Sequence, residues 1–344
     1  MCLRLLYAAL VMVALLAGCG GGGAQTSTDR VEGGMTANEF SVIVLPDTQC
    51  YTSNGAPNDP GDCGGKGNMQ MFEAQVNWIR SNLASRRIKA VIGVGDIVEC
   101  GESAEQWANA KAAYDVVDAS GTIYVPALGG REYDSSCAHN DYSARPTRNY
   151  NANFGPQRFA GKSWYGNSSY PSVSNDNFFV DFETGGQKFT ILALEFFPRD
   201  AALAWASGIV SSRRDRKVIV ATHGYLKGTG ERIVDSDPVG PTKYKLVADN
   251  SGQELWDKFL SQHENIILVL CGHDAGAARR ADAGVAGNIV AQIHANYQFN
   301  GGNGYLRILT FRPEQNTIAV KTYSPYENQY RTTDPHEFTI RYGR

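Results

Sequence analysis

The stretch IKAVIGVGDIVE, residues 88–99, joins an apolar run to an abrupt polar ending. Ile88 to Val94 predicts a buried strand, and Gly95-Asp96-Ile97-Val98-Glu99 follows it directly. Open α/β sheets bind ligands at the carboxyl ends of their strands. Three further apolar runs end in the same manner, and we expect their endings to meet at one site: Pro46-Asp47-Thr48-Gln49, Thr222-His223-Gly224 and Cys271-Gly272-His273-Asp274-Ala275.

The side chains at these four strand ends are of types that bind metal ions. Carboxylate, amide and imidazole donors suit hard or borderline divalent cations. An Asp after a strand can instead cap a helix, which is the structural alternative for two of them. The candidate ligands are Asp47, Gln49, Asp96, His223 and His273.

The order of elements in the first part of the chain predicts parallel strands. Apolar runs alternate with segments of helical periodicity, and Ser103 with Gln106 resembles a capping box at the start of the second helix. A β-α-β-α-β order implies right-handed crossovers. The expected strands are 40–45, 88–94 and 122–126, and the expected helices are 69–85 and 103–118.

The second part of the chain predicts a mixed arrangement. A hairpin turns at Gly185-Gly186, and the last segments are all strands. The fold class expected is α/β, with two mixed β-sheets flanked by helices. The segments are a surface excursion at 134–174, strands at 177–182, 188–194, 217–221, 265–271, 289–293, 305–311, 317–323 and 337–342, helices at 199–211 and 252–262, and a loop at 225–250.

The beginning of the chain has the pattern of an export signal. Arg4 precedes an apolar run from Leu5 to Leu16, which is too short to span a bilayer. Leu16-Ala17-Gly18-Cys19 then resembles the lipobox of bacterial lipoproteins, in which the cysteine is lipidated. A plain secretory signal or an uncleaved anchor are the alternatives. We therefore expect a signal peptide at 1–18, a lipidated Cys19 with a flexible tether at 19–38, and one domain at 39–344.

This reading places the domain at the bacterial cell envelope, on its periplasmic or extracellular face, held to the membrane by the lipid. The 344 residues carry a net charge of −3 without a basic block, which argues against a nucleic-acid partner.

Seven cysteines fit an exported protein. Cys2 would leave with the signal peptide. Cys271 ends an apolar run and is expected to be a buried free thiol. The four cysteines left after Cys19 are expected to pair as Cys50–Cys63 and Cys100–Cys137, although a reducing compartment would leave them free.

The motifs, their order and their spacing resemble the calcineurin-like metallophosphoesterases. The resemblance covers roughly residues 40–342 and includes sequence segments outside the ligand motifs. It implies one or two divalent ions (Mn, Fe or Zn), with Asp96 bridging, Asp47 and Gln49 on the first and His223 and His273 on the second. The supporting segments are Asn149-Tyr150, Phe154-Gly155-Pro156, Gly161-Lys162-Ser163-Trp164-Tyr165, Leu194-Glu195-Phe196, Pro198-Arg199-Asp200 and Asn303-Gly304-Tyr305-Leu306-Arg307.

The chain departs from the family pattern at three positions. Gly130 stands where the family has an Asn ligand of the second metal, and Ala275 where it has a His ligand of the first. Arg131 replaces the His that assists the leaving group, and a guanidinium stays protonated in proteins, so it cannot donate a proton to that group. Arg131 could still pair with a phosphate oxygen. Each metal would keep three protein ligands, as in many catalytic zinc sites.

Two functions are compatible with this pattern. One is an envelope-anchored, metal-dependent phosphoesterase of impaired activity that acts on a phosphate ester. The other is a non-catalytic protein that keeps the fold as a binding or scaffolding surface. Three nearby carboxylates could rescue metal binding, namely Glu132, Asp134 and Asp274, and four other histidines are interpreted as surface or core residues: His139, His263, His294 and His336.

Overall fold

Two seven-stranded mixed sheets form the centre of the domain in the computed structural model. The structure describes residues 35–55, 63, 66–137, 142–246, 249–298 and 302–344. The signal peptide predicted at 1–18, the lipidated Cys19, most of the tether and His139 lie outside the described residues.

The first sheet contains the parallel strands that the sequence predicts. Its order is β13-β12-β11-β1-β2-β3, with β14 also paired to β12. β1 is parallel to β2 and β2 to β3, whereas β11 runs antiparallel to β1. The strands are β1 (Phe40–Leu45), β2 (Ile88–Gly93), β3 (Ile123–Pro126), β11 (Leu306–Arg312), β12 (Thr317–Ser324), β13 (Gln329–Arg331) and β14 (Phe338–Arg341).

The second sheet has the order β4-β5-β6-β7-β8-β10-β9. β6, β7, β8 and β10 are mutually parallel in this order, and the predicted hairpin is formed by β5 and β6. The strands are β4 (Tyr165–Tyr170), β5 (Asn177–Thr184), β6 (Gln187–Ala193), β7 (Lys217–Ala221), β8 (Ile266–Cys271), β9 (Gly276–Ala283) and β10 (Ile289–Asn296).

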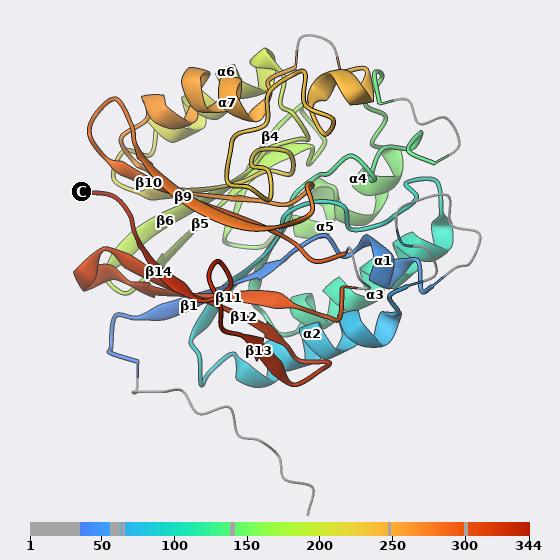
Figure 1. The fold of residues 1–344 in the computed structure, drawn as a ribbon, viewed down its shortest axis with the longest axis horizontal. Coiled ribbons are helices and arrows are strands. Elements are labelled where there is room, and N and C mark those ends of the chain that lie inside the picture. Colours follow the sequence, from blue (N-terminus) through green and yellow to red (C-terminus); the bar gives the residue numbers. More distant parts are fainter. Residues whose placement is uncertain (1–34, 56–62, 64–65, 138–141, 247–248, 299–301) are drawn as a thin grey trace, which may run out of the picture. The chain divides into compact units, whose positions relative to one another are not determined.

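Helices cover the outer face of each sheet (Figure 1). α2 and α3 lie on the first sheet, and α6 and α7 lie on the second. The fold class predicted from the sequence is therefore confirmed. The helices are α1 (Gln49–Thr52), α2 (Met69–Asn82), α3 (Ala104–Ala119), α4 (Arg148–Phe154), α5 (Pro156–Phe159), α6 (Asp200–Ser211) and α7 (Gly252–Lys258), with 3-10 turns η1 (Pro241–Tyr244), η2 (Leu260–Gln262) and η3 (Pro313–Gln315).

The core is built from strands that are apolar on both faces. All six residues of β1 and of β8 are buried, as expected for strands covered on both sides. One large cluster fills the space between the sheets and under α2 and α3, and a second lies between the second sheet and α6 and α7.

The interpretation of residues 134–174 as a surface excursion was wrong. The segment contains α4, α5 and β4, and its aromatic side chains enter the core. Tyr150 and Phe154 are fully buried and contact Trp107 of α3. Polar residues separate the aromatic residues of this segment, so the sequence shows no regular apolar spacing that would predict their burial.

Further elements escaped the sequence reasoning, among them α1, β13, β9 and η1. The sequence of β9 is GAARRADA, which contains no β-branched residue. β9 is the edge strand of its sheet, so only one of its sides pairs with another strand. η1 lies inside the loop expected at 225–250. The capping box at Ser103 is half formed: Ser103 Oγ accepts from Gln106 N at 3.3 Å, while Gln106 Oε1 accepts from Glu99 N and Cys100 N.

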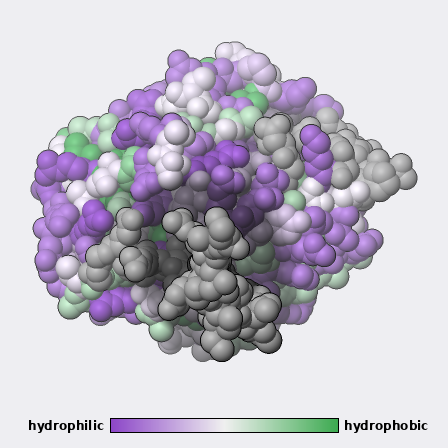
Figure 2. Space-filling view, turned by 60° about the horizontal axis from the view of Figure 1, so that its bottom comes forward, coloured by the Kyte–Doolittle hydropathy of each residue, from purple (hydrophilic) through white to green (hydrophobic). Residues whose placement is uncertain are grey.

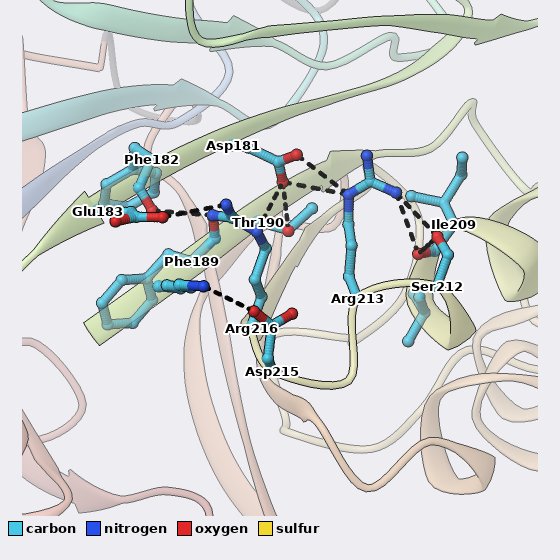
Figure 3. A network of polar contacts seen from close by, with 12 residues as sticks. Asp181, Phe182, Glu183, Phe189, Thr190, Ile209, Ser212, Arg213, Asp215 and Arg216 are labelled. Atoms are coloured by element: carbon cyan, nitrogen blue, oxygen red, sulfur yellow. Dashed lines mark hydrogen bonds and ion pairs between the residues drawn. The ribbon is translucent and has the colours of Figure 1, made fainter.

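A polar network ties the second sheet together at the ends of its strands opposite the four motifs (Figure 3). Asp181 of β5 accepts from Thr190 Oγ1 of β6 at 2.6 Å and from Arg213 Nε at 3.1 Å. Arg216, just before β7, bridges to Glu183 at 3.2 Å. These residues stabilise the sheet at a distance from the motifs.

The described surface has no dominant apolar face. On the side shown in Figure 2, hydrophilic residues prevail outside the grey atoms and hydrophobic ones are scattered. The large apolar side chains that are exposed are isolated from one another in the sequence: Val173, Val234, Val285 and Tyr326. Among the described residues, the helices are all too short or too polar to cross a membrane.

The predicted cysteine pairing is confirmed. The disulfides are Cys50–Cys63 and Cys100–Cys137, and Cys271 is a buried free thiol. Each bridge begins one residue after a motif position, Gln49 in one case and Glu99 in the other. The bridges therefore constrain the loops that carry those positions.

Replacing both Cys100 and Cys137 with serine should lower the free energy of unfolding by about 2–4 kcal/mol, because the bridge closes a long loop of the unfolded chain. Urea denaturation of the oxidised wild type and the double variant measures this difference. An unchanged free energy of unfolding, or free thiols at all four positions in the oxidised protein, would contradict the assignment.

Candidate metal centre

Four loops meet where the parallel strands of the two sheets end. Asp47 follows β1, Asp96 follows β2, His223 follows β7 and His273 follows β8. One ligand atom from each of Asp96, His223 and His273 lies within 4.8 Å of the others. The structure thus brings together residues separated by up to 226 positions in the sequence, since His273 N donates to Asp47 Oδ1.

The backbone at these positions is strained. φ is +38° at Asp47, +48° at Asp96 and +79° at His273, a region that side-chain-bearing residues rarely adopt. Such conformations cost of order 1–3 kcal/mol and concentrate at functional sites. Main-chain donors help to hold them, since His273 N donates to Asp47 Oδ1 (3.1 Å) and Arg131 N donates to Asp96 Oδ1 (2.9 Å).

Gly95 makes the approach of these loops possible. Its φ of +98° suits glycine, and a Cβ there would lie 2.7 Å from His223 Nδ1 and 2.8 Å from Gly129 Cα. A larger residue at position 95 would therefore push the Asp96 loop away from His223.

Each histidine is anchored through one ring nitrogen to a backbone carbonyl. His223 Nδ1 lies 2.8 Å from Val94 O, and His273 Nε2 lies 2.9 Å from Val239 O. Because a carbonyl only accepts, the anchored nitrogen carries the proton, and Nε2 of His223 and Nδ1 of His273 remain for a ligand. This is the outer-shell arrangement typical of metal-binding histidines.

The charges of the site favour a cation between Asp96 and His223. His223 Nε2 lies 3.0 Å from Asp96 Oδ2. Burial lowers the pKa of His223, but Asp96 and Asp47 outweigh it and raise the pKa to about 9. Burial raises the pKa of Asp96, but His223 and Arg131 bring it down to about 2. A proton on His223 thus occupies a position that a divalent ion would also satisfy.

The second histidine is neutral. Burial and the positive charge of His223 lower the pKa of His273 to about 3. A neutral imidazole is the form that binds metal.

Asp47 Oδ2 is a buried oxygen of the site that has no hydrogen-bond partner among the described residues. Burial holds the pKa of Asp47 well above its usual range. Buried polar atoms are normally satisfied, so this oxygen marks a position that a cation could fill. The donor set therefore fits a divalent cation.

Gln49 lies beside the two aspartates. In the amide orientation that satisfies its neighbours, its nitrogen donates to Asp96 O (3.0 Å) and to Asp47 O (3.1 Å). The amide oxygen is then the atom left for a cation.

An aromatic ring lies against position 130. A Cβ on Gly130 would lie 3.0 Å from Phe196 Cε1, 3.2 Å from Phe196 Cδ1 and 3.4 Å from Tyr142 Cε1. The Phe196 ring centroid is also 5.3 Å from that of His223 and 4.9 Å from that of His273. An Asn at position 130 would require Phe196 to move.

Arg131 forms an ion pair beside the site. Its Nη1 lies 3.3 Å from Oε1 of Glu99, whose side chain is fully buried. The Arg131 side chain remains 20% exposed and lines the cleft above Asp96. Part of its positive charge is thus already compensated by Glu99.

The carboxylates considered for rescue bind backbone amides instead. Glu132 accepts from Asp96 N, Ile97 N, Val98 N and Gly129 N at 2.5–3.1 Å. Asp274 accepts from Gly228 N, and Asp134 accepts from the first amides of α4. None of the three belongs to the group of ligand atoms that the described residues bring together.

Glu132 has a structural role of its own. Burial and the charge of Asp96 raise the pKa of Glu132 to about 7, and the amide donors oppose this by favouring the carboxylate. Its four contacts fix the loop after β2 and hence the direction of Asp96.

Two residues that the sequence did not single out as functional connect the motifs. Gln298 Nε2 donates to Asp47 O, and its Oε1 accepts from Cys50 N at 3.0 Å. Asn296 Nδ2 donates to His273 O at 2.9 Å, and its Oδ1 accepts from Gln298 N. Their only sequence signal was their place directly after a strand. His294, two residues earlier, is a buried core residue with a pKa lowered to about 3 by burial.

An open cleft lies over these residues. Its polar side is formed by acids, amides and Arg131, and its other side by aromatic rings. The residues lining it include Gln49, Asp96, Gly130, Arg131, Tyr142, Phe196, Tyr244, His273, Asp274, Ala275, Asn296 and Gln298.

Similarity to a solved structure agrees with this description. No family model matches the chain. Purple acid phosphatase PPD1 from yellow lupin (Lupinus luteus) aligns over 89% of this chain and 54% of its own, with a TM-score of 0.50 and 13% identity. GAP50, the anchor in the inner membrane complex of Plasmodium, aligns over 89% of both chains with a TM-score of 0.49 and 13% identity. The chain has the calcineurin-like metallophosphoesterase fold that its motifs predict.

One relative is similar in sequence. The uncharacterised protein YvnB of Bacillus subtilis is 30% identical over 307 residues, which are 86% of this chain and 21% of YvnB. The chain thus spans about a fifth of the length of this relative.

Replacing Glu132 with glutamine should destabilise the fold by at least about 2 kcal/mol. The side-chain NH2 group of glutamine would face backbone N–H groups and could not accept hydrogen bonds from them. Thermal or urea unfolding measures the change, and Glu73→Gln on the exposed side of α2 is the matched control, expected within about 0.5 kcal/mol of the wild type. Equal effects of the two substitutions would show that the four amide contacts do not stabilise the loop.

Proposed function

We propose that this chain is a metal-dependent phosphoesterase of low catalytic power, with a divalent ion held by Asp96, His223 and His273. The observation that carries the proposal is the orientation of the two histidines. Each is anchored to a carbonyl through one ring nitrogen, which leaves its other nitrogen to bind an ion in place of a proton. One ligand atom of each histidine lies within 4.8 Å of a carboxylate oxygen of Asp96. Asp47 and Gln49 offer donors for a second, weaker position next to Asp96.

The charge around the cleft explains why a metal would be needed. Five carboxylates lie in or near the cleft, and among the described residues that line it Arg131 supplies the permanent positive charge. A phosphate ester would be repelled unless a cation compensated them. The five are Asp47, Asp96, Glu99, Glu132 and Asp274.

When bound, such an ion activates water and neutralises charge on phosphate. The chain's own residues would do the rest. Asp96, fixed by Glu132 and Arg131 N, would orient the ion, and the exposed part of Arg131 would contact a phosphate oxygen. No histidine stands at position 131 to protonate the leaving group, and general-acid assistance is typically worth a factor of ~10² to 10⁴.

A non-catalytic role is the second candidate, and a specific observation favours it. Phe196 fills the place of one ligand and Glu99 engages Arg131. On this reading the cleft binds a phosphate ester without turning it over, and the fold serves as a binding or scaffolding surface.

The location proposed is the bacterial cell envelope, with a lipid on Cys19 as the membrane anchor. Two disulfides in the described domain support an oxidising compartment. We propose no nucleic-acid partner, given the net charge of −3.

Metal content and turnover test the two functions together. Native mass spectrometry should find bound Zn²⁺ or Mn²⁺, and Asp96→Asn should weaken binding at least about tenfold, a loss usual even for groups that only orient ligands. Asp257→Asn, on the exposed side of α7, is the matched control and should bind normally. Slow hydrolysis of chromogenic phosphate mono- or diesters that Asp96→Asn abolishes supports the enzyme. Bound metal without turnover supports the binding protein, and failure of the protein to bind metal overturns the proposed metal centre.

Anchoring is tested separately in a bacterial host. Cys19→Ser should prevent incorporation of a labelled fatty acid and release the protein from the membrane fraction, since a cysteine thiol accepts the lipid. Retention of the serine variant in washed membranes would contradict the lipoprotein assignment.

A further inference from the structure

Phe196 forms a wall over the two histidines of the candidate metal centre. Its ring centroid lies within 5.3 Å of both imidazoles, and a Cβ on Gly130 would approach it to 3.0 Å. Phe197 and Tyr244 also pack on His273, at centroid distances of 5.8 and 5.4 Å. The side of the histidines that faces position 130 is therefore lined by aromatic rings.

Arg145 holds the backbone that carries Phe196. Arg145, itself buried, donates to Phe196 O (2.6 Å) and Phe197 O (2.7 Å) and pairs with Asp249 at 2.9 Å. Phe197 has a φ of +45°. Because two main-chain oxygens on consecutive residues are bound by one guanidinium, Phe196 has little freedom to withdraw.

We propose that Phe196 determines the coordination of the ion on the histidine side. It keeps a side-chain donor at position 130 out of the site, so that an ion there would have three protein donors and an open position for a solvent or substrate oxygen. Two imidazoles, one carboxylate and one open position match four-coordinate zinc. Manganese and magnesium prefer six oxygen-rich ligands, which the wall does not admit. This inference rests on the metal binding proposed above and adds a selectivity determinant.

Cobalt substitution provides a direct readout. Four-coordinate Co²⁺ absorbs visible light several-fold more strongly than six-coordinate Co²⁺. The full domain loaded with one equivalent of Co²⁺ should therefore show the intense spectrum, and titration should saturate its high-affinity site at one ion per chain. The wild-type spectrum tests the inference even where a variant fails to fold.

Variants then assign the effect to Phe196. Phe196→Ala should weaken the cobalt bands as water enters, while Phe196→Leu, which keeps an apolar side chain, should weaken them less. Adding Gly130→Asn to Phe196→Ala should reduce the preference for Zn²⁺ over Mn²⁺ by about tenfold or more, the usual scale for changes near metal ligands. Phe259→Ala, in the cluster under α6 and α7, removes an equally buried ring and should leave the spectrum unchanged.

The outcomes separate this inference from the proposed function. A weak, six-coordinate spectrum in the wild type, two tight ions per chain, or a spectrum unaffected by Phe196→Ala would overturn the inference while metal binding stands. Absence of any cobalt or zinc binding would overturn both.

Discussion

The buried carboxylate of Glu132 is the contact on which the geometry of the site depends. It accepts from three successive amides of the loop after β2 and from Gly129 after β3. One side chain thus joins two neighbouring strand ends and turns Asp96 toward His223. Charge-assisted contacts of this kind are roughly twice as strong as neutral ones, which helps to offset the strained backbone of Asp96. Glu132, which the sequence suggested as a replacement ligand, instead fixes the direction of Asp96.

The sequence predicted which strand ends come together, but not what surrounds them. Asp47, Asp96, His223 and His273 are predictable because each directly follows an apolar strand, and strand ends meet at a fixed edge. Phe196 also follows a strand, yet nothing local distinguishes a ring that covers a metal site from one in the core. Gln298 and Asn296 act through backbone groups 251 and 23 residues away, a relation that only the folded chain defines.

The same dependence on tertiary contacts explains where the fold prediction was wrong. The residues of β9 have no strand propensity, and pairing to β10 along its whole length is what makes them a strand. The segment at 134–174 was misread because its polar residues are numerous, although its buried aromatic rings and Arg145 support the loop that carries Phe196. Tertiary contacts, not local preferences, determine both regions.

The space beside Gly130 is filled by packing. Voids in protein interiors are costly. Here the space is occupied by Phe196, whose backbone is bound by Arg145. Gly130 and Phe196 therefore belong together, because an Asn side chain at position 130 would require Phe196 to move. The ring of Phe196 and the loops that carry Asp96, His223 and His273 thus determine the shape of the site together.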